Sequence, residues 1–167
     1  MWLSNTNHWF TIIHYQSPCA PAHLARPLYR AYSSAAIDHF YTMDKSEYDN
    51  AVNNLGYSPE GVACKIFKNS GGETSPLYRL YRSAGQDHFY TASASEASSA
   101  IQGGAYVLEG IAGYVFTDNH CHGIPLFRLY NGNLVDHFYT TSVAERDNAN
   151  QKLGYAEEGI AAYVLPK

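Results

Sequence analysis

The chain contains one unit of 49 residues three times in succession, and this repeat constrains the fold more than any other feature of the sequence. The pentapeptide Asp-His-Phe-Tyr-Thr occupies residues 38–42, 87–91 and 136–140. A Pro-Leu-Tyr-Arg or Pro-Leu-Phe-Arg motif precedes each copy, and a Glu-Gly-Val-Ala or Glu-Gly-Ile-Ala motif follows it. Such a short unit cannot bury its apolar side alone, so the three units must pack against one another.

The first half of each unit is predicted to form a β-hairpin. In the first unit, a strand over 27–32 is followed by a five-residue loop, 33–37, and by a second strand, 38–42. If Tyr32 lies opposite Asp38, alternation divides the hairpin into two faces. One face then carries Leu28, Arg30, Tyr32, Asp38, Phe40 and Thr42, and the other carries Tyr29, Ala31, His39 and Tyr41. A slip of one residue would exchange the faces, and the sequence leaves open which face is buried.

The second half of each unit is predicted to form a short helix and a third strand. Asp44 lies three residues before Glu47, which is the spacing of a capping box, and Gly56 lies where the helix would end. The third strand is expected over 61–67. The corresponding features of the other units are Ser93 with Glu96, Ser142 with Glu145, the glycines 103–104 and 154, and the strands 110–116 and 159–165.

The sequence therefore predicts a mostly β, α+β fold built from three β-β-α-β repeats. We expect one domain, 1–167, with the repeats at 27–75, 76–124 and 125–167. A closed ring with pseudo-threefold symmetry, propeller- or trefoil-like, is favoured over an open solenoid, because three units without caps would leave exposed edges. Residues 1–26 precede the repeats, and the aromatic run 9–15 is expected to add one strand.

Composition narrows the classes of function. The net charge of −4 argues against a nucleic-acid partner, which normally requires a basic surface. No apolar run approaches the ~20 residues needed to cross a bilayer, so membrane insertion is not expected. Residues 1–8 do not read as a signal peptide. The protein is accordingly expected to be secreted or extracellular with its export signal missing from this sequence, or cytoplasmic without a signal peptide.

The three cysteines are too few for a disulfide framework, and their number is odd. Free thiols are therefore the favoured interpretation, although Cys19 and Cys121 both lie in linkers and are placed where they can pair.

The repeated Asp-His dipeptide is the sharpest chemical feature of the sequence. A carboxylate beside an imidazole is compatible with acid–base catalysis, but one active site does not need three identical copies. Alternatively, Asp38 caps the loop or pairs with Arg30, and His39 is a satisfied, partly buried histidine. A third interpretation is ligand binding at three equivalent pockets. No unit differs at this motif, so the chain is predicted not to be an enzyme.

Metal and cofactor sites are weakly indicated. His39, His88 and His137 would have to converge on the threefold axis to hold zinc. The cluster His120-Cys121-His122 is unique to one linker and is better explained as exposed loop residues. No phosphate-binding glycine loop, Cys-x-x-Cys or Gly-x-Ser-x-Gly motif is present, so neither a metal nor a cofactor is predicted.

Carbohydrate binding fits the composition better, because 15 of the 24 aromatic residues are tyrosine. Sugars present an apolar ring face, which stacks on aromatic rings, and hydroxyl groups, which need polar partners. Single sugar sites are typically of millimolar strength, about −4 kcal/mol, and three sites on one rigid body would gain avidity. The predicted ligand-binding residues are Arg30, Asp38, His39, Tyr41 and Glu60, Arg79, Asp87, His88, Tyr90 and Glu109, and Arg128, Asp136, His137, Tyr139 and Glu158.

Taken together over residues 27–165, the three motifs resemble a repeat domain of unknown function that is widespread in secreted bacterial and fungal proteins. That domain often accompanies peptidase or glycan-active modules, so the resemblance implies an accessory or adhesive role and carries over no binding residues. The chain departs from the pattern at Cys64-Lys65 and in the position of the helix-end glycine of the second unit. The predicted pseudo-threefold, tyrosine-rich architecture of the chain is also similar to that of small mushroom lectins.

Two non-enzymatic functions follow from this reading. The first is a lectin with up to three equivalent sites for cell-surface glycans. The second is a structural or protein-binding module of the cell envelope, for which the Asp-His-Phe-Tyr-Thr strand would be buried and the variable loops 33–37, 82–86 and 131–135 would bind. The sequence leaves oligomer formation open.

Overall fold

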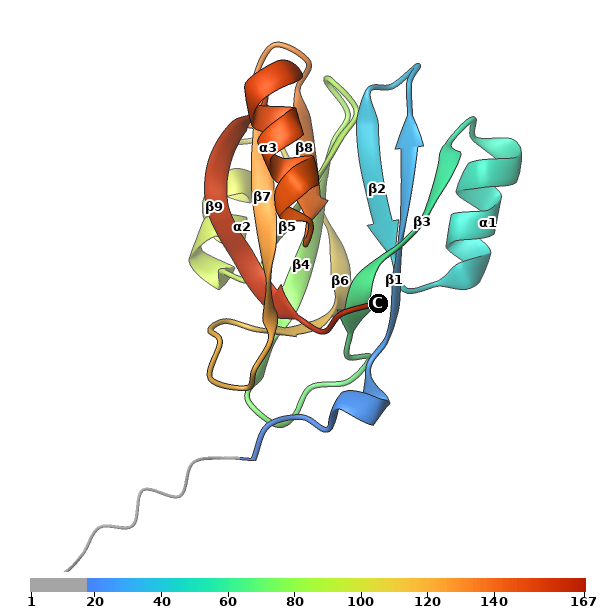
Figure 1. Cartoon of the computed structure of the whole chain (residues 1–167). Helices are drawn as coiled ribbons and strands as arrows, with labels where there is room; N and C mark the ends of the chain where they lie inside the picture. The colour runs from blue at the N-terminus through green and yellow to red at the C-terminus, as the bar shows by residue number, and fades with distance from the viewer. Residues whose placement is uncertain (1–17) are drawn as a thin grey trace, which may run out of the picture.

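The computed structural model describes residues 18–167, and within them it confirms three β-β-α-β units (Figure 1). A short 3-10 helix, Ala22–Leu24, leads into the first unit. The first unit comprises β1 (Arg26–Ser33), β2 (Asp38–Thr42), α1 (Lys45–Asn54) and β3 (Ser58–Ile66). The second comprises β4 (Thr74–Arg82), β5 (Asp87–Thr91), α2 (Ala94–Gln102) and β6 (Val107–Phe116). The third comprises β7 (Ile124–Asn131), β8 (Asp136–Thr140), α3 (Val143–Lys152) and β9 (Ala156–Val164).

Each unit forms an antiparallel three-stranded sheet with its first strand in the centre. The first unit has the order β2-β1-β3. The other two units share a curled six-stranded sheet, a half-barrel with the order β5-β4-β6-β9-β7-β8, which is joined through the pair Phe116 and Tyr163. Isolated bridges from Phe67 to Tyr114 and from Lys65 to Leu165 connect the first unit to the other two. The fold is therefore mostly β, with the helices as smaller additions such as α1 along the outer side of its sheet (Figure 1).

The hairpin register differs from the prediction by one residue. Tyr32 lies opposite His39, and Ser33 opposite Asp38, so β1 runs one residue further than expected and the loop contains four residues. The turn is closed by Ile37, which adopts a left-handed conformation with φ of 56°. Consequently Arg30 shares a face with His39 and Tyr41 rather than with Asp38 and Phe40.

The third strand begins three residues earlier than predicted. Two irregularities in the pairing of β1 with β3 let Tyr32 pair with Ser58 instead of ending the ladder at Arg30 and Gly61. Gly61 lies at the second irregularity with φ of 82°, a conformation that residues with a side chain rarely adopt. The glycine of the Glu-Gly motif is therefore a β-bulge inside the strand and not the start of the strand.

Only half of each predicted capping box is confirmed, namely the cap side chain that binds the start of the helix. The Asp44 carboxylate accepts hydrogen bonds from the N–H groups of Ser46 and Glu47. The Ser93 and Ser142 hydroxyls each accept one hydrogen bond, from the N–H of the glutamate three residues later. In a capping box the glutamate returns to the backbone N–H of the cap residue. Here that N–H donates instead to Thr42 Oγ1, at 3.0 Å, which leaves Glu47 available for another unit.

Three tyrosines form the centre of the molecule. Tyr41, Tyr90 and Tyr139 are at most 2% exposed and pack edge to face, with ring centroids 5.4–5.5 Å apart. The Tyr90 hydroxyl accepts from the backbone N–H of Tyr41 and donates to its carbonyl, at 2.9 and 2.8 Å. Tyr139 binds Tyr90 in the same way, and Tyr41 binds Tyr139. Each unit thus satisfies backbone groups of another one.

The expectation of free thiols was wrong for two of the three cysteines. Cys19 and Cys121 form a disulfide, and Cys64 is a free thiol buried in the core. Cys64 lies on β3 and packs in the core, so it is not available for a disulfide. The two remaining cysteines, both in linkers, pair with each other. The chain before the first unit and the linker between the second and third units therefore meet at one end of the molecule.

The strand predicted over 9–15 lies outside the described residues. Across 18–167, no helix combines the length and the apolar character needed to cross a membrane.

Candidate functional site

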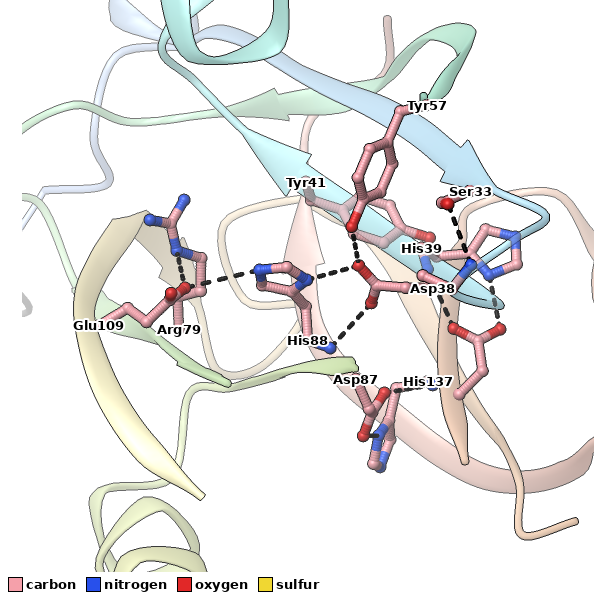
Figure 2. A network of polar contacts seen from close by, with 12 residues as sticks. Ser33, Asp38, His39, Tyr41, Tyr57, Arg79, Asp87, His88, Glu109 and His137 are labelled. Atoms are coloured by element: carbon pink, nitrogen blue, oxygen red, sulfur yellow. Dashed lines mark hydrogen bonds and ion pairs between the residues drawn. The ribbon is translucent and has the colours of Figure 1, made fainter. Parts of the chain in front are cut away.

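The invariant aspartate and histidine bind across the boundary between units and not within one unit. The His88 backbone N–H and ring Nδ1 donate to the two oxygens of Asp38, at 2.9 and 2.7 Å (Figure 2). The hydroxyl of Tyr57, which follows α1, donates to the same carboxylate. The equivalent sets are Asp87 with His137 and Tyr106, and Asp136 with His39 and Tyr155.

These contacts fix the position of the three aspartates and favour the charged form of Asp87. The three carboxylates are completely buried. Burial alone would raise the pKa of Asp87, but the hydrogen bond and the charge of His137, with help from Tyr106, bring that pKa below its ordinary value. Burial and the charge of Asp38 raise the pKa of Tyr57, so its hydroxyl stays protonated and donates.

The invariant arginine also connects neighbouring units. Arg79 makes ion pairs with Glu47 of α1, at 3.0 Å, and with Glu109 of β6, at 2.9 Å. Its guanidinium lies 5.5 Å from the ring centroid of Phe40, so it is held by a cation–π contact as well. The Arg79–Glu109 pair continues through a 3.6 Å contact to His88 Nε2 (Figure 2). We refer to the arginine, its two glutamates and the phenylalanine as the clamp.

The other two clamps have the same construction. Their members are Arg30, Glu60, Glu145 and Phe138, and Arg128, Glu158, Glu96 and Phe89. The hydrogen bond from Arg30 is the largest influence on Glu145 and helps to lower the pKa of its carboxyl to about 2. The glutamates that end the predicted capping boxes thus serve as contacts between units.

A cleft lies beside the clamp between the third and first units. Its volume is about 430 Å³, which is within the range of small-molecule sites. Arg30, His39 and Glu60 supply charged and polar groups to one wall, and Tyr32 stacks on His39 with ring centroids 4.6 Å apart. The third unit contributes Leu134, Phe138, Glu145, Asn148, Leu153 and Tyr155. The cleft thus presents aromatic and aliphatic surface next to oriented polar groups.

The structure divides the residues that the sequence singled out into two groups. The arginines, the histidines and the glutamates of the Glu-Gly motif come together at the clamps. The aspartates are completely buried, and the central tyrosines lie in the core, at most 2% exposed. The first group is Arg30, His39, Glu60, Arg79, His88, Glu109, Arg128, His137 and Glu158. The second is Asp38, Tyr41, Asp87, Tyr90, Asp136 and Tyr139.

Sequence reasoning missed several residues that line the cleft. Phe138 shows its role only once the neighbouring unit is in place, and Glu145 was assigned to a helix cap alone. Leu134 and Asn148 vary among the units, so the repeat gave no signal for them. Their variability was itself the available signal, because a variable residue next to invariant ones is not required by the fold.

Within residues 18–167, the three histidines do not form a metal-binding group, since each ring Nδ1 donates to an aspartate. Oxygens of Asp38, Asp87 and Asp136 lie within 4.8 Å of one another, but each carboxylate already accepts from a backbone N–H, an imidazole and a tyrosine hydroxyl. The other candidate group contains Cys19, which is in the disulfide, together with Glu73 and His120.

Comparison with known proteins places the chain in a family. Residues 27–165, all three units, match the family described as Domain of unknown function (DUF5648), and the chain belongs to that family. No curated protein and no solved structure matches the chain. The family confirms the resemblance seen in the repeated motifs and assigns no activity.

Proposed function

We propose that the protein is a lectin whose three units close into a pseudo-threefold ring and bind glycans in the clefts between units. The contacts that support closure are cyclic: each central tyrosine hydroxyl binds the backbone of the equivalent tyrosine in another unit, and the three aspartate–histidine pairs run in the same order. The cleft between the third and first units is the observation that carries the binding proposal.

The chemistry of this cleft suits a sugar ring. The exposed edges of Tyr32, Leu134 and Leu153 offer apolar surface for the carbon face of a pyranose. His39 and Asn148 offer hydrogen-bonding groups for its hydroxyls. The clamp fixes Arg30 before a ligand arrives, so little conformational freedom is lost on binding. Binding without catalysis fits a site that is repeated in three units.

The three clefts are expected to differ in affinity. Leu134 and Leu153 form apolar walls in the cleft between the third and first units, but glycines 85 and 104 occupy the aligned positions between the second and third units. Ser99 replaces Asn148 there. The cleft between the third and first units is therefore proposed as the strongest site, and the other two clefts as weaker sites that add avidity on a multivalent surface.

We place this function outside the cytosol. The Cys19–Cys121 disulfide supports an oxidising compartment, because disulfides persist mainly in secreted and extracellular proteins.

A glycan array followed by titration with the best glycan tests the lectin proposal. Asn148→Ala is expected to weaken binding at least tenfold, whereas Asn53→Ala, an exposed helix substitution outside the cleft, leaves it unchanged. Replacing Leu134 and Leu153 by glycine should make the cleft resemble its weaker counterpart. A blank array together with a negative haemagglutination test would exclude the lectin.

One observation favours a protein-binding envelope module as a second candidate. The Asp-His-Phe-Tyr-Thr strands are largely buried, as that function requires, and the turns between hairpin strands vary. Alanine at His39, His88 and His137 discriminates between the candidates. The module predicts lower stability with unchanged affinity for the partner, whereas the lectin predicts reduced glycan affinity at temperatures where the variants remain folded.

A further inference from the structure

A second hollow, of about 890 Å³, lies between the first and second units. Its walls are the beginning of β1, the beginning of α1 and residues 109–114 of β6. It borders the Arg79 clamp on the side of Pro27 and Met43, whereas the cleft proposed for sugar borders its own clamp on the side of the hairpin turn. The hollow is thus a separate site and does not rest on the lectin proposal.

Three basic residues in this hollow break the repeat. Arg26 aligns with Ser75 and Ile124 of the other units, Lys45 with Ala94 and Val143, and Lys68 with Thr117 and Pro166. All six aligned residues are uncharged. Residues that the fold demands recur in every unit, as the clamp arginines do. Three cations gathered at one hollow and absent from its two counterparts therefore indicate a role beyond folding.

The carboxylates around the hollow are already in use. Glu47 and Glu109 both bind Arg79, and Asp44 accepts the N–H groups at the start of α1. Lys45 is paired with Asp49. Among residues 18–167, no carboxylate forms an ion pair with Arg26 or Lys68. These two cations remain available for an anion that comes from outside the chain.

The position of the two cations indicates an extended ligand. Arg26 and Lys68 also line a neighbouring hollow of about 340 Å³ under the linker 67–72, so the two hollows adjoin at these side chains. Backbone carbonyls of His23 and Ala25 accept from the Arg26 guanidinium and hold it in place. Among the residues that the structure describes, 18–167, no acidic one lines the smaller hollow.

We infer that the joined hollows bind an acidic polysaccharide, with Arg26 and Lys68 taking its carboxylate or sulfate groups. The rings of Tyr29 and Tyr114 and the exposed side chain of Ile111 provide surface for the intervening sugar rings. Two available cations on a protein with a net charge of −4 match a polymer whose charges are separated by whole sugar rings better than a nucleic acid, whose denser phosphate charge normally requires a strongly basic surface.

Titration with defined oligosaccharides tests this inference. The probes are a polygalacturonate oligomer, its methyl-esterified form, and a sulfated galactan oligomer, which together separate carboxylate from sulfate as the recognised group. We expect the intact protein to bind at least one acidic oligomer and to bind the esterified one at least tenfold more weakly. Arg26→Gln with Lys68→Gln should reduce the affinity for the acidic oligomer at least tenfold.

The matched control is Arg82→Gln with Lys152→Gln, which removes the same charge away from both hollows and should retain the affinity. Circular dichroism verifies that each double variant is folded. Equal affinity of the two double variants, or equal affinity for acidic and esterified oligomers, overturns the proposal. Tighter binding of poly-glutamate or of single-stranded DNA than of either acidic oligomer overturns the assignment to polysaccharide. Because Asn148 lies in the other cleft, Asn148→Ala should leave this binding intact.

Discussion

The hydroxyl groups of three buried tyrosines connect the backbones of all three units. Tyr41→Phe would remove the partner of the Tyr139 N–H and carbonyl without changing the packing of the ring. We expect a loss of about 2–4 kcal/mol in the free energy of unfolding, because a buried polar group left without a partner costs about 1–3 kcal/mol. Urea denaturation measures it, and phenylalanine at Tyr90 or Tyr139 should have a similar effect.

Tyr29→Phe is the control for these substitutions. The Tyr29 ring packs on Tyr48, and within the described chain its hydroxyl makes no hydrogen bond, so a change below about 0.5 kcal/mol is expected. Comparable losses at Tyr29 and Tyr41 would show that the cyclic hydrogen bonds contribute little.

The clamp glutamates make stability depend on pH in the acid range. The pKa of Glu145 falls from 4.5 to about 2 on folding, chiefly through its hydrogen bond from Arg30. A carboxyl whose pKa is lower in the folded state stabilises the protein above its unfolded pKa, and this contribution is lost as the pH falls toward the folded pKa. Glu145→Gln should therefore be less stable than the unaltered protein at pH 7, and the difference should shrink between pH 4.5 and about 2.

Denaturation of the unaltered protein and of Glu145→Gln at pH 7, 4 and 2.5 measures this difference in the free energy of unfolding. A gap in the free energy of unfolding that stays constant or widens toward low pH would contradict the assignment of this contribution to the Glu145 carboxylate.

The partners of the charged residues were only partly predictable from the sequence. The repeat correctly identified Arg30, Asp38 and His39 as a recurring set. One sequence interpretation paired Asp38 with Arg30 of the same unit, whereas Asp38 binds His88 of the next unit. With identical motifs 49 residues apart, a contact within a unit and a contact between units produce the same sequence pattern. Only the packing of the units separates them.

The hairpin turns carry backbone strain in all three units. Ile37, Gln86 and Val135 occupy the same position and adopt φ of 56–58°, a region that β-branched residues avoid. Ile37→Asn is expected to stabilise the protein by about 0.5–1 kcal/mol, because asparagine tolerates this conformation and the left-handed form costs other residues about 1–2 kcal/mol. Thermal denaturation tests this, and a variant less stable by more than 1 kcal/mol would show that the isoleucine side chain contributes more by packing than its backbone costs.

Among the elements, those governed by local chemistry were predicted and those governed by long-range contacts were not. The Asp44 cap and the helix after it follow from neighbouring residues and are confirmed. The register of β1 with β2 was wrong by one residue, because nothing local indicated that Ile37 would take the left-handed turn position that glycine or asparagine usually fills. The bulge at Gly61 likewise depends on pairing with β1.

At the scale of the whole molecule, the Cys19–Cys121 disulfide ties the lead-in of the first unit to the linker before the third. Replacing both cysteines by serine should lower the free energy of unfolding by about 2–4 kcal/mol, the usual contribution of a disulfide. Denaturation with and without a reducing agent measures this. The reductant should destabilise the unaltered protein and leave the double variant unchanged. If reduction alters neither, the bond has no part in stability.

The overall architecture was predictable to the level of three β-β-α-β units but no further. The repeat determines how many units there are and what each contains. It does not determine which strands join into one sheet, since the link between β6 and β9 consists of a single residue pair, Phe116 with Tyr163. Such a link leaves no pattern in the composition of either strand.

The exchange of hydroxyl groups among Tyr41, Tyr90 and Tyr139 bears on the ancestry of the chain. Chains shorter than about 40 residues usually need a disulfide, a metal or partner chains to fold. A single 49-residue unit would be only slightly longer than this limit. It would also have left its tyrosine hydroxyl without a neighbouring backbone to bind. The same bonds become available when three copies of that peptide associate. The observed bonds are therefore compatible with association of separate copies, and a peptide of one unit is expected to assemble in threes.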